Sequence, residues 1–181
     1  LTLVETDQTR TMWPHRTKLS IDIIVGSRLK IALTTDNLGG DDVVIGEALH
    51  TYFQIGDIAD IHISGLGGCD YLDKAGGGSV RRRQDGPVVF SSEIDRIYLN
   101  AGTACVVHAP RLQRRIHVAK SGSRSTVVWN PWTEKANKMG DFGLDGWREM
   151  VCIESANAAE NVVTVSAGRQ HSIAVEYWTE K

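Results

Sequence analysis

The stretch EALHTYF, residues Glu47 to Phe53, ends a predicted β-strand that begins at Val43. Successive side chains of a strand point to opposite faces, so Ala48, His50 and Tyr52 share one face. The residues that precede His50 on that face are very small, which leaves a shallow space beside an imidazole and a phenol. An imidazole in such a space can give or take a proton near neutral pH. The spacing alone favours the alternative, a core histidine with a satisfied hydrogen bond.

Short apolar segments separated by Gly, Asp, Asn and Ser recur along the chain. Their regular spacing predicts an all-β fold, an antiparallel β-sandwich or barrel. The length fits one domain, residues 1–181. The predicted strands are Lys18–Val25, Arg28–Thr34, Val43–Ile55, Ile58–Leu66, Gly86–Phe90, Asp95–Leu99, Thr103–His108, Arg114–Ala119, Ser125–Trp129, Glu149–Glu154, Val162–Ser166 and Ser172–Trp178.

Three segments between these strands carry turn or loop signals. Gly26-Ser27 predicts a two-residue hairpin turn with glycine at positive φ. Gly76–Ser79, followed by Arg81–Arg83, predicts a solvated hairpin tip, because the P-loop pattern that would favour phosphate binding is absent. Phosphate contact by these arginines stays a weaker alternative. Thr133–Gly146 predicts a loop with at most one helical turn.

The composition is that of a soluble globular protein, with 41% hydrophobic residues, 23% charged residues and a net charge of −2. This balance gives no sign of a nucleic-acid or membrane partner. Three cysteines without a CxxC pair indicate a reducing compartment, and we expect a cytoplasmic protein. The histidines show no metal-ligand spacing, so no metal site is expected.

Two carboxylates are candidate site residues. Glu154 shares a strand face with Met150 and Cys152, and a carboxylate beside apolar side chains tends to have a raised pKa and a function. A strand-end glutamate that simply reaches water is an equally good interpretation. Asp95 can accept hydrogen bonds from ligand hydroxyls, although in isolation a surface ion pair with arginine is favoured.

The segment Trp129-Asn130-Pro131-Trp132 places two tryptophans at the end of a predicted strand. Tryptophan faces can stack on sugar rings, because C–H groups pack on the apolar ring surface. The favoured interpretation here is core packing or loop anchoring, with Asn130 satisfying backbone groups nearby. No Gly-x-Ser-x-Gly elbow is present, which argues against a serine hydrolase.

From about Trp13 onward the chain resembles the glucose-6-phosphate 1-epimerases, a branch of the aldose 1-epimerase (mutarotase) superfamily. The elements HTYF, VWNPW and VCIE, in this order, are together quite specific. The residues that carry the resemblance are Leu49–Phe53, Asp57-Ile58, Gly65-Leu66, Tyr71–Lys74, Glu93–Tyr98, Val127–Trp132, Lys135, Met139, Asp141-Phe142, Met150–Glu154 and Ala167-Gly168.

This resemblance implies a galactose-mutarotase-like β-supersandwich and interconversion of the α and β anomers of a hexose 6-phosphate. The family's catalytic residues fall on His50 and Glu154, and its sugar-binding aspartate falls on Asp95. The family also carries a preceding segment with strands and phosphate-contacting arginines. We therefore expect this chain to be the C-terminal part of a longer protein, with its N-terminal strands lacking and sheet edges left unpaired.

The chemistry implied by the resemblance suits these residues, with Glu154 as base and a protonated His50 as acid, without cofactor or metal. One rival is a non-catalytic carbohydrate-binding or regulatory β-sandwich, which would need no acid–base pair. A second rival is a glycosidase with Glu154 and Asp95 as its carboxylates, which would leave His50 without a role. Fold alone does not decide among these, and the sequence gives no oligomeric state.

Overall fold

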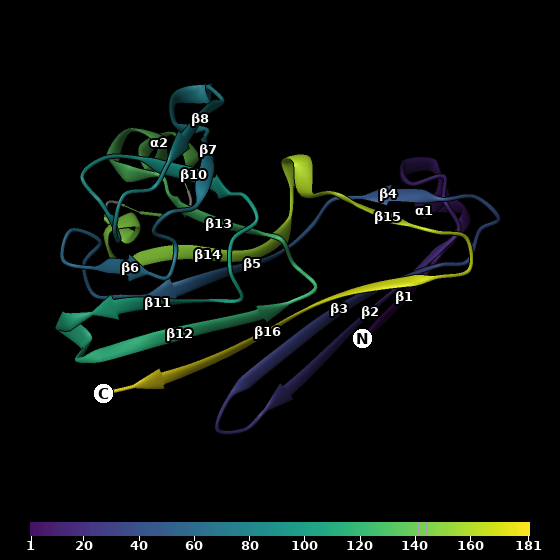
Figure 1. Ribbon diagram of the computed structural model, residues 1–181, viewed down its shortest axis with the longest axis horizontal. Coiled ribbons are helices and arrows are strands. Elements are labelled where there is room, and N and C mark those ends of the chain that lie inside the picture. Colours follow the sequence, from purple (N-terminus) through teal and green to yellow (C-terminus); the bar gives the residue numbers. More distant parts are fainter. Residues whose placement is uncertain (141, 144) are drawn as a thin grey trace.

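The computed structural model describes residues 1–140, 142–143 and 145–181, and most of them lie in β-strands. The strands form an eight-stranded sheet, a six-stranded sheet and a separate two-stranded pair, and neighbouring strands are antiparallel (Figure 1). The all-β prediction is therefore confirmed. Asp141, one of the residues that carry the resemblance, lies outside the described residues.

The larger sheet has the strand order β1-β2-β3-β16-β12-β11-β6-β9. The strands β2 and β3 of this sheet alternate apolar and polar residues along most of their length, as expected of strands with one buried face. Its strands are β1 (Thr2–Val4), β2 (Thr17–Val25), β3 (Leu29–Asn37), β16 (Gln170–Glu180), β12 (Arg114–Ser121), β11 (Ala104–Ala109), β6 (His62–Ser64) and β9 (Val88–Val89).

The smaller sheet has the strand order β5-β14-β13-β10-β7-β8, which leaves β5 at one edge. The remaining pair is β15-β4. The strands are β5 (Glu47–Gln54), β14 (Met150–Asn157), β13 (Ser125–Asn130), β10 (Ile94–Tyr98), β7 (Asp70–Asp73) and β8 (Val80–Arg83), with β15 (Val163–Val165) and β4 (Val43–Ile45) in the pair.

Short helical segments connect these strands. The α-helices are α1 (Asp7–Met12) and α2 (Trp132–Met139). Single 3₁₀ turns are η1 (Ala75–Gly77), η2 (Pro110–Leu112), η3 (Gly146–Glu149) and η4 (Ala159–Asn161). None of the helices among the described residues is long and apolar enough to cross a membrane.

The main core lies between the two sheets, where the smaller sheet lies over the β16-β12-β11 part of the larger one (Figure 1). Inward side chains from both sheets are almost fully buried there, which is the dominant stabilising contribution in a β-sandwich. They include Ile63, Val107, Ile116 and Val118 from the larger sheet, and Tyr98, Val128, Val151 and Ile153 from the smaller one.

The part of the larger sheet formed by β1, β2 and β3 extends beyond the smaller sheet (Figure 1). Ile23, Ile24 and Val25 at the end of β2 expose 54%, 62% and 81% of their surface. In the described part of the chain, β5 likewise has a strand on only one side.

The predicted two-residue turn at Gly26-Ser27 is wrong. Val25 pairs with Leu29, so the turn contains three residues, and Gly26 is not among the glycines with positive φ. The register explains the difference, because it aligns apolar partners across the two strands, such as Ile23 with Ile31. A two-residue turn would shift this register by one residue and oppose inward to outward side chains.

Two predicted strands are shorter than expected. The predicted strand Val43–Ile55 is interrupted at Gly46, where β4 leaves to pair with β15 and β5 joins the smaller sheet. The predicted strand Ile58–Leu66 is reduced to β6. Its first residues form a turn instead, in which the buried Asp57 accepts from the backbone of Ala59 and pairs with Arg148.

The loop predicted at Thr133–Gly146 is also wrong in its first half, because α2 is a helix of eight residues. Good helix formers, including Glu134, Lys135 and Ala136, occupy its interior. Gly140 ends the helix in the left-handed conformation, with φ of +75°. The predicted hairpin tip is confirmed, since β7 and β8 pair on either side of the glycines.

Gly122 lies in the turn that joins β12 of the larger sheet to β13 of the smaller. It has φ of +70°, and a Cβ there would lie 2.0 Å from the carbonyl oxygen of Ser172. We expect Gly122→Ala to lower the free energy of unfolding by more than the roughly 1–2 kcal/mol that a left-handed backbone costs. Urea denaturation measures this loss.

The matched control is Gly76→Ala, because Gly76 has a similar φ of +67° and open space where its Cβ would lie. This variant should lose only the backbone contribution. Equal losses in the two variants would contradict a steric role for the close approach to Ser172.

Candidate functional site

Four neighbouring strands of the smaller sheet place the predicted site residues on one face. β5 pairs with β14 so that His50 lies directly opposite Glu154. The pairing of β14 with β13, and of β13 with β10, puts Cys152, Trp129 and Asp95 in the next row across the sheet. Directly paired residues of antiparallel strands point to the same side, as do residues two apart. The structure therefore brings His50, Glu154 and Asp95 to the same face.

His50 and Glu154 are in direct contact. The Nε2 atom of His50 lies 3.2 Å from Oε1 of Glu154, which is a hydrogen-bond distance. The two side chains differ in access to solvent, since 45% of the His50 side chain is exposed and only 10% of Glu154. The pair thus consists of an accessible imidazole held by a carboxylate that lies deeper in the sheet face.

Burial raises the pKa of Glu154 above its ordinary value, although the nearby His50 acts to lower it, and the charge of Asp95 raises it further. The environment that causes this shift is apolar. Cys152, in the next row of the same face, is fully buried, and burial also raises the pKa of its thiol. A carboxyl group with this shift gives and takes a proton closer to neutral pH than an exposed glutamate does.

Asp95 is not isolated on this face. The Nζ atom of Lys135, from α2, lies 2.8 Å from Oε1 of Glu93 and 3.4 Å from Oδ2 of Asp95. Burial acts to lower the pKa of Lys135, but the hydrogen bond and charge of Glu93, together with Asp95, raise it overall. Lys135 is therefore a fixed cation beside the Asp95 carboxylate.

Aromatic rings surround the acid–base pair. The ring of His50 stacks on Tyr52 with centroids 4.9 Å apart and meets the Trp129 ring at 6.2 Å. Tyr52 is 55% exposed and Trp129 only 9%. The interpretation of Trp129 as a core-packing residue is supported, because it packs against Met150 and Cys152. Tyr52 offers the accessible ring surface on which a sugar could pack.

The side chain of Asn130 forms hydrogen bonds to the segments that carry the site. This side chain is fully buried and donates to the carbonyl oxygens of Trp147 and Met150, at 2.8 and 2.9 Å. Its Oδ1 atom accepts from the backbone N–H of Trp132, at the first residue of α2. The prediction that Asn130 satisfies nearby backbone groups is confirmed. Through these bonds Asn130 fixes the start of the helix that carries Lys135.

Lys135 is the residue of this site to which the sequence assigned no role. Only its place among the residues that carry the resemblance singled it out. The loop predicted over Thr133–Gly146 hid the useful signal, which is the run of helix formers Glu134, Lys135 and Ala136. Within the described part of the chain, no group of three or more His, Cys, Asp or Glu residues is arranged to hold a metal ion.

Comparison with known proteins gives a family match over nearly the whole chain. Residues 1–178 match the aldose 1-epimerase family. The chain is 32% identical over 163 residues to a protein of Cenchrus ciliaris named "Putative glucose-6-phosphate 1-epimerase", covering 88% of this chain and 49% of that protein. It is 34% identical over 158 residues to an Escherichia coli protein of the same name, covering 87% and 52%. The chain thus spans about half the length of the curated relatives it matches.

Solved structures share the fold. A putative mutarotase from Salmonella typhimurium superposes with a TM-score of 0.88 at 30% sequence identity, covering 99% of this chain and 59% of that one. A galactose mutarotase related enzyme from Lactobacillus acidophilus gives a TM-score of 0.79 at 11% identity, covering 99% and 67%. The second likeness concerns the fold alone. Together these findings confirm the resemblance inferred from the sequence and the galactose-mutarotase-like fold.

The raised pKa of Glu154 predicts a pH-dependent effect on stability. The folded protein holds this proton more tightly than the unfolded chain, so folding stability is lost as pH rises from the ordinary value of 4.5 through the raised one. Glu154→Gln removes the charge and keeps the shape. We expect this variant to be more stable than the parent chain at about pH 8, by roughly 0.5–2 kcal/mol, and to differ little at about pH 4.

Urea denaturation at both pH values measures the effect. Glu134→Gln is the control, because Glu134 is an exposed glutamate of α2. A Glu154→Gln variant that is less stable than the parent at about pH 8 would show that the contact with His50 outweighs the cost of burying the charge.

Proposed function

The chain belongs to the aldose 1-epimerase family, and we propose that it interconverts the α and β anomers of a hexose 6-phosphate. Glucose 6-phosphate is the substrate that the names of the curated relatives favour. The observation that carries the proposal is the contact between a buried carboxylate of raised pKa and an accessible imidazole, Glu154 and His50. Such a pair supplies a base and an acid side by side.

The reaction begins with the ring-closed sugar in its hemiacetal form. Glu154 removes the proton from the anomeric hydroxyl while protonated His50 gives its proton to the ring oxygen. The bond between the anomeric carbon and the ring oxygen breaks, which leaves an open-chain aldehyde and a hydroxyl group. After rotation about the bond between the first two carbons, the hydroxyl attacks the other face of the aldehyde. Glu154 then returns its proton to the new anomeric oxygen, and His50 recovers its own.

The positions of the two groups fit these roles. The anomeric hydroxyl and the ring oxygen are bonded to the same carbon, so base and acid must lie close together, as His50 and Glu154 do. Both proton transfers use side chains, so the proposal includes no metal or cofactor.

Asp95 is the residue we propose to orient sugar hydroxyls, with Lys135 holding its carboxylate in place. A glycosidase is disfavoured, because it would leave His50, which contacts Glu154, without a role. The expectation that phosphate-contacting arginines lie in a preceding segment stays a prediction. Lys135 is not proposed to contact the phosphate, because Glu93 and Asp95 already engage it. The cytoplasm is the compartment we propose, and the three cysteines are free thiols.

Substitution of the acid–base pair tests the proposal. Glu154→Gln keeps the shape of the base without its charge, and His50→Asn removes the acid. Each should lower the rate of anomer exchange by roughly 10²–10⁴-fold, as followed by exchange NMR on glucose 6-phosphate. Sugar binding should weaken much less, because the lost contacts act mainly in the transition state. The double variant should be little slower than the poorer single one, since both groups serve one proton relay.

The rate should depend on pH as a bell, falling on the acid side when Glu154 gains a proton and on the alkaline side when His50 loses one. The raised pKa of Glu154 moves the acid limb toward neutral pH. Wild-type exchange by a folded Glu154→Gln variant would exclude Glu154 as the base. Sugar binding without any exchange in the parent chain would favour a carbohydrate-binding module instead.

Substrate choice is tested by comparing kcat/KM for glucose 6-phosphate with that for free glucose. We expect at least about a tenfold preference for the phosphorylated sugar, as a charge-assisted contact to a phosphate supplies. The exchange rate measured with Glu154→Gln, which includes the background exchange in buffer, is subtracted from each rate of the parent chain. Equal kcat/KM values for the two sugars, in a protein whose exchange depends on Glu154, would refute the preference but leave the epimerase proposal standing.

A further inference from the structure

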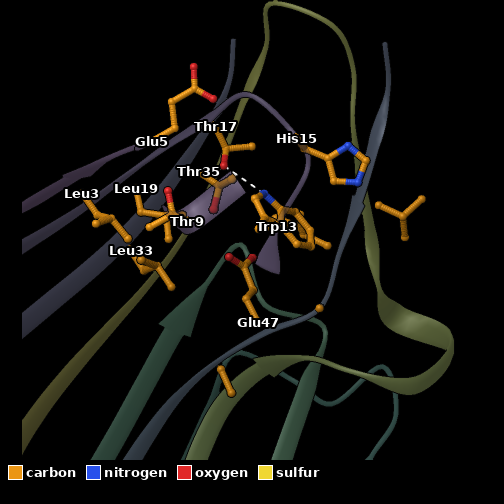
Figure 2. Close-up of a pocket in the computed structure, with 14 residues that line it drawn as sticks. Leu3, Glu5, Thr9, Trp13, His15, Thr17, Leu19, Leu33, Thr35 and Glu47 are labelled. Carbon is orange, nitrogen blue, oxygen red and sulfur yellow. Dashed lines mark hydrogen bonds between the residues drawn. The ribbon is translucent and has the colours of Figure 1, made fainter. Parts of the chain in front are cut away.

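A cavity of about 470 Å³, shown in Figure 2, has neither His50 nor Glu154 among its lining residues. It is formed where β1, the segment around α1, and β2 and β3 face β4 and the beginning of β5. Its volume is in the range of small-molecule sites. The lining is mostly apolar and includes Leu3, Trp13, Leu19, Leu33 and Val44.

Glu47 places a carboxylate in this apolar lining. Only 6% of its side chain is exposed, and Figure 2 shows the carboxylate pointing toward Trp13. Its Oε1 atom accepts from Nδ2 of Asn157 at 3.0 Å and lies 3.1 Å from Nε2 of His171. Its Oε2 atom is buried without any hydrogen-bond partner. A buried carboxylate oxygen without a donor costs free energy, and a ligand donor would recover it.

The neighbouring groups do not satisfy Oε2 of Glu47. The Nδ2 atom of Asn157 also donates to the carbonyl oxygen of Gly122, at 3.0 Å, which uses its second hydrogen. Arg10 and Arg16 are both bonded to Glu5, another lining residue. Burial acts to raise the pKa of Glu5, but the hydrogen bonds from these two arginines lower it. Glu5 is therefore a satisfied carboxylate, and Glu47 is the one that needs a further donor.

We propose that this cavity binds a guanidinium group carried on a short apolar stem, with Oε2 of Glu47 accepting from the cation. The apolar lining suits the stem, and a charged donor offsets a buried carboxylate better than a hydroxyl does. The cation comes from a free small molecule or from an arginine side chain of a polypeptide. This inference stands on the cavity and on Glu47, and it does not depend on the proposed epimerase activity.

Trp13 is the residue that must respond to the ligand. Its ring lies above the Glu47 carboxylate in Figure 2, is 39% exposed, and is held by a hydrogen bond from Nε1 to the hydroxyl of Thr17. Because Oε2 of Glu47 has almost no exposed surface, the cation reaches it by moving this ring aside. The indole N–H resonance of Trp13 should therefore shift on binding.

The experiment titrates the folded chain with n-butylguanidinium and with the peptide acetyl-Ala-Arg-Ala-amide, followed by calorimetry and by the Trp13 indole resonance. Butanol and butyrate serve as neutral and anionic probes with apolar stems of similar length. We expect saturable binding of at least one cationic probe and at least about tenfold weaker binding of the other two. Binding of n-butylguanidinium identifies a free small molecule, and binding of the peptide alone identifies a polypeptide side chain.

Two variants place the binding in the cavity. Glu47→Gln keeps the shape of the side chain without its charge, and should weaken binding by at least about tenfold. Val44→Phe fills the cavity from a wall residue that is 59% exposed, so it should fold and abolish binding even if Glu47→Gln does not fold. Val80→Phe is the control, because Val80 is an exposed valine of β8, outside the cavity lining.

Absence of binding by both cationic probes would overturn the inference. Equal binding to the parent chain and to Val44→Phe would do the same, because it would place the cation elsewhere on the surface. Equal affinity for n-butylguanidinium and butyrate would show that the apolar stem alone is recognised, without the carboxylate of Glu47.

Discussion

The hydrogen-bonded register of β5 on β14 is the constraint on which the site depends. It sets His50 opposite Glu154, so that one imidazole nitrogen meets one carboxylate oxygen at 3.2 Å. A shift of one residue would turn His50 to the other side of the sheet. The inward residues of β5 resist this shift, since Leu49 and Phe53 pack against the main core. The acid–base geometry is thus secured by hydrophobic packing on the opposite face of the same strand.

The second support of the site is the buried side chain of Asn130. It joins the end of β13 to the start of α2 and to the turn that precedes β14. Lys135 can then reach Asp95 and Glu93 from the helix, and Trp129 packs beneath the pair. Removal of this amide would leave several backbone groups unsatisfied in an apolar region. One residue without a role in the chemistry therefore positions several residues around it.

Alternation of apolar and polar residues predicted most of the strands and which residues share a face with His50, because side chains at every second position of a strand lie on the same side. The same signal could not show that His50 and Glu154 are in contact, since strand pairing over such a separation leaves no local trace in the sequence. It also missed the break at Gly46, where the chain changes sheets. Lys135 was hidden because the sequence predicted a loop over most of α2, which begins at Trp132, whose backbone N–H donates to the side chain of Asn130.

The proposed proton transfer and the proposed binding of a phosphate place different demands on this sheet face. The contact of Glu154 with His50 and the apolar row beside it come from β5 and its neighbours in the smaller sheet. Lys135 lies on the same side of the sheet through its contact with Asp95. Because Glu93 and Asp95 both hold its ammonium group, Lys135 is poorly suited to bind a phosphate. The proposed proton transfer uses only His50 and Glu154, which lie on this sheet face. The proposed recognition of a phosphorylated sugar therefore needs a cation other than Lys135.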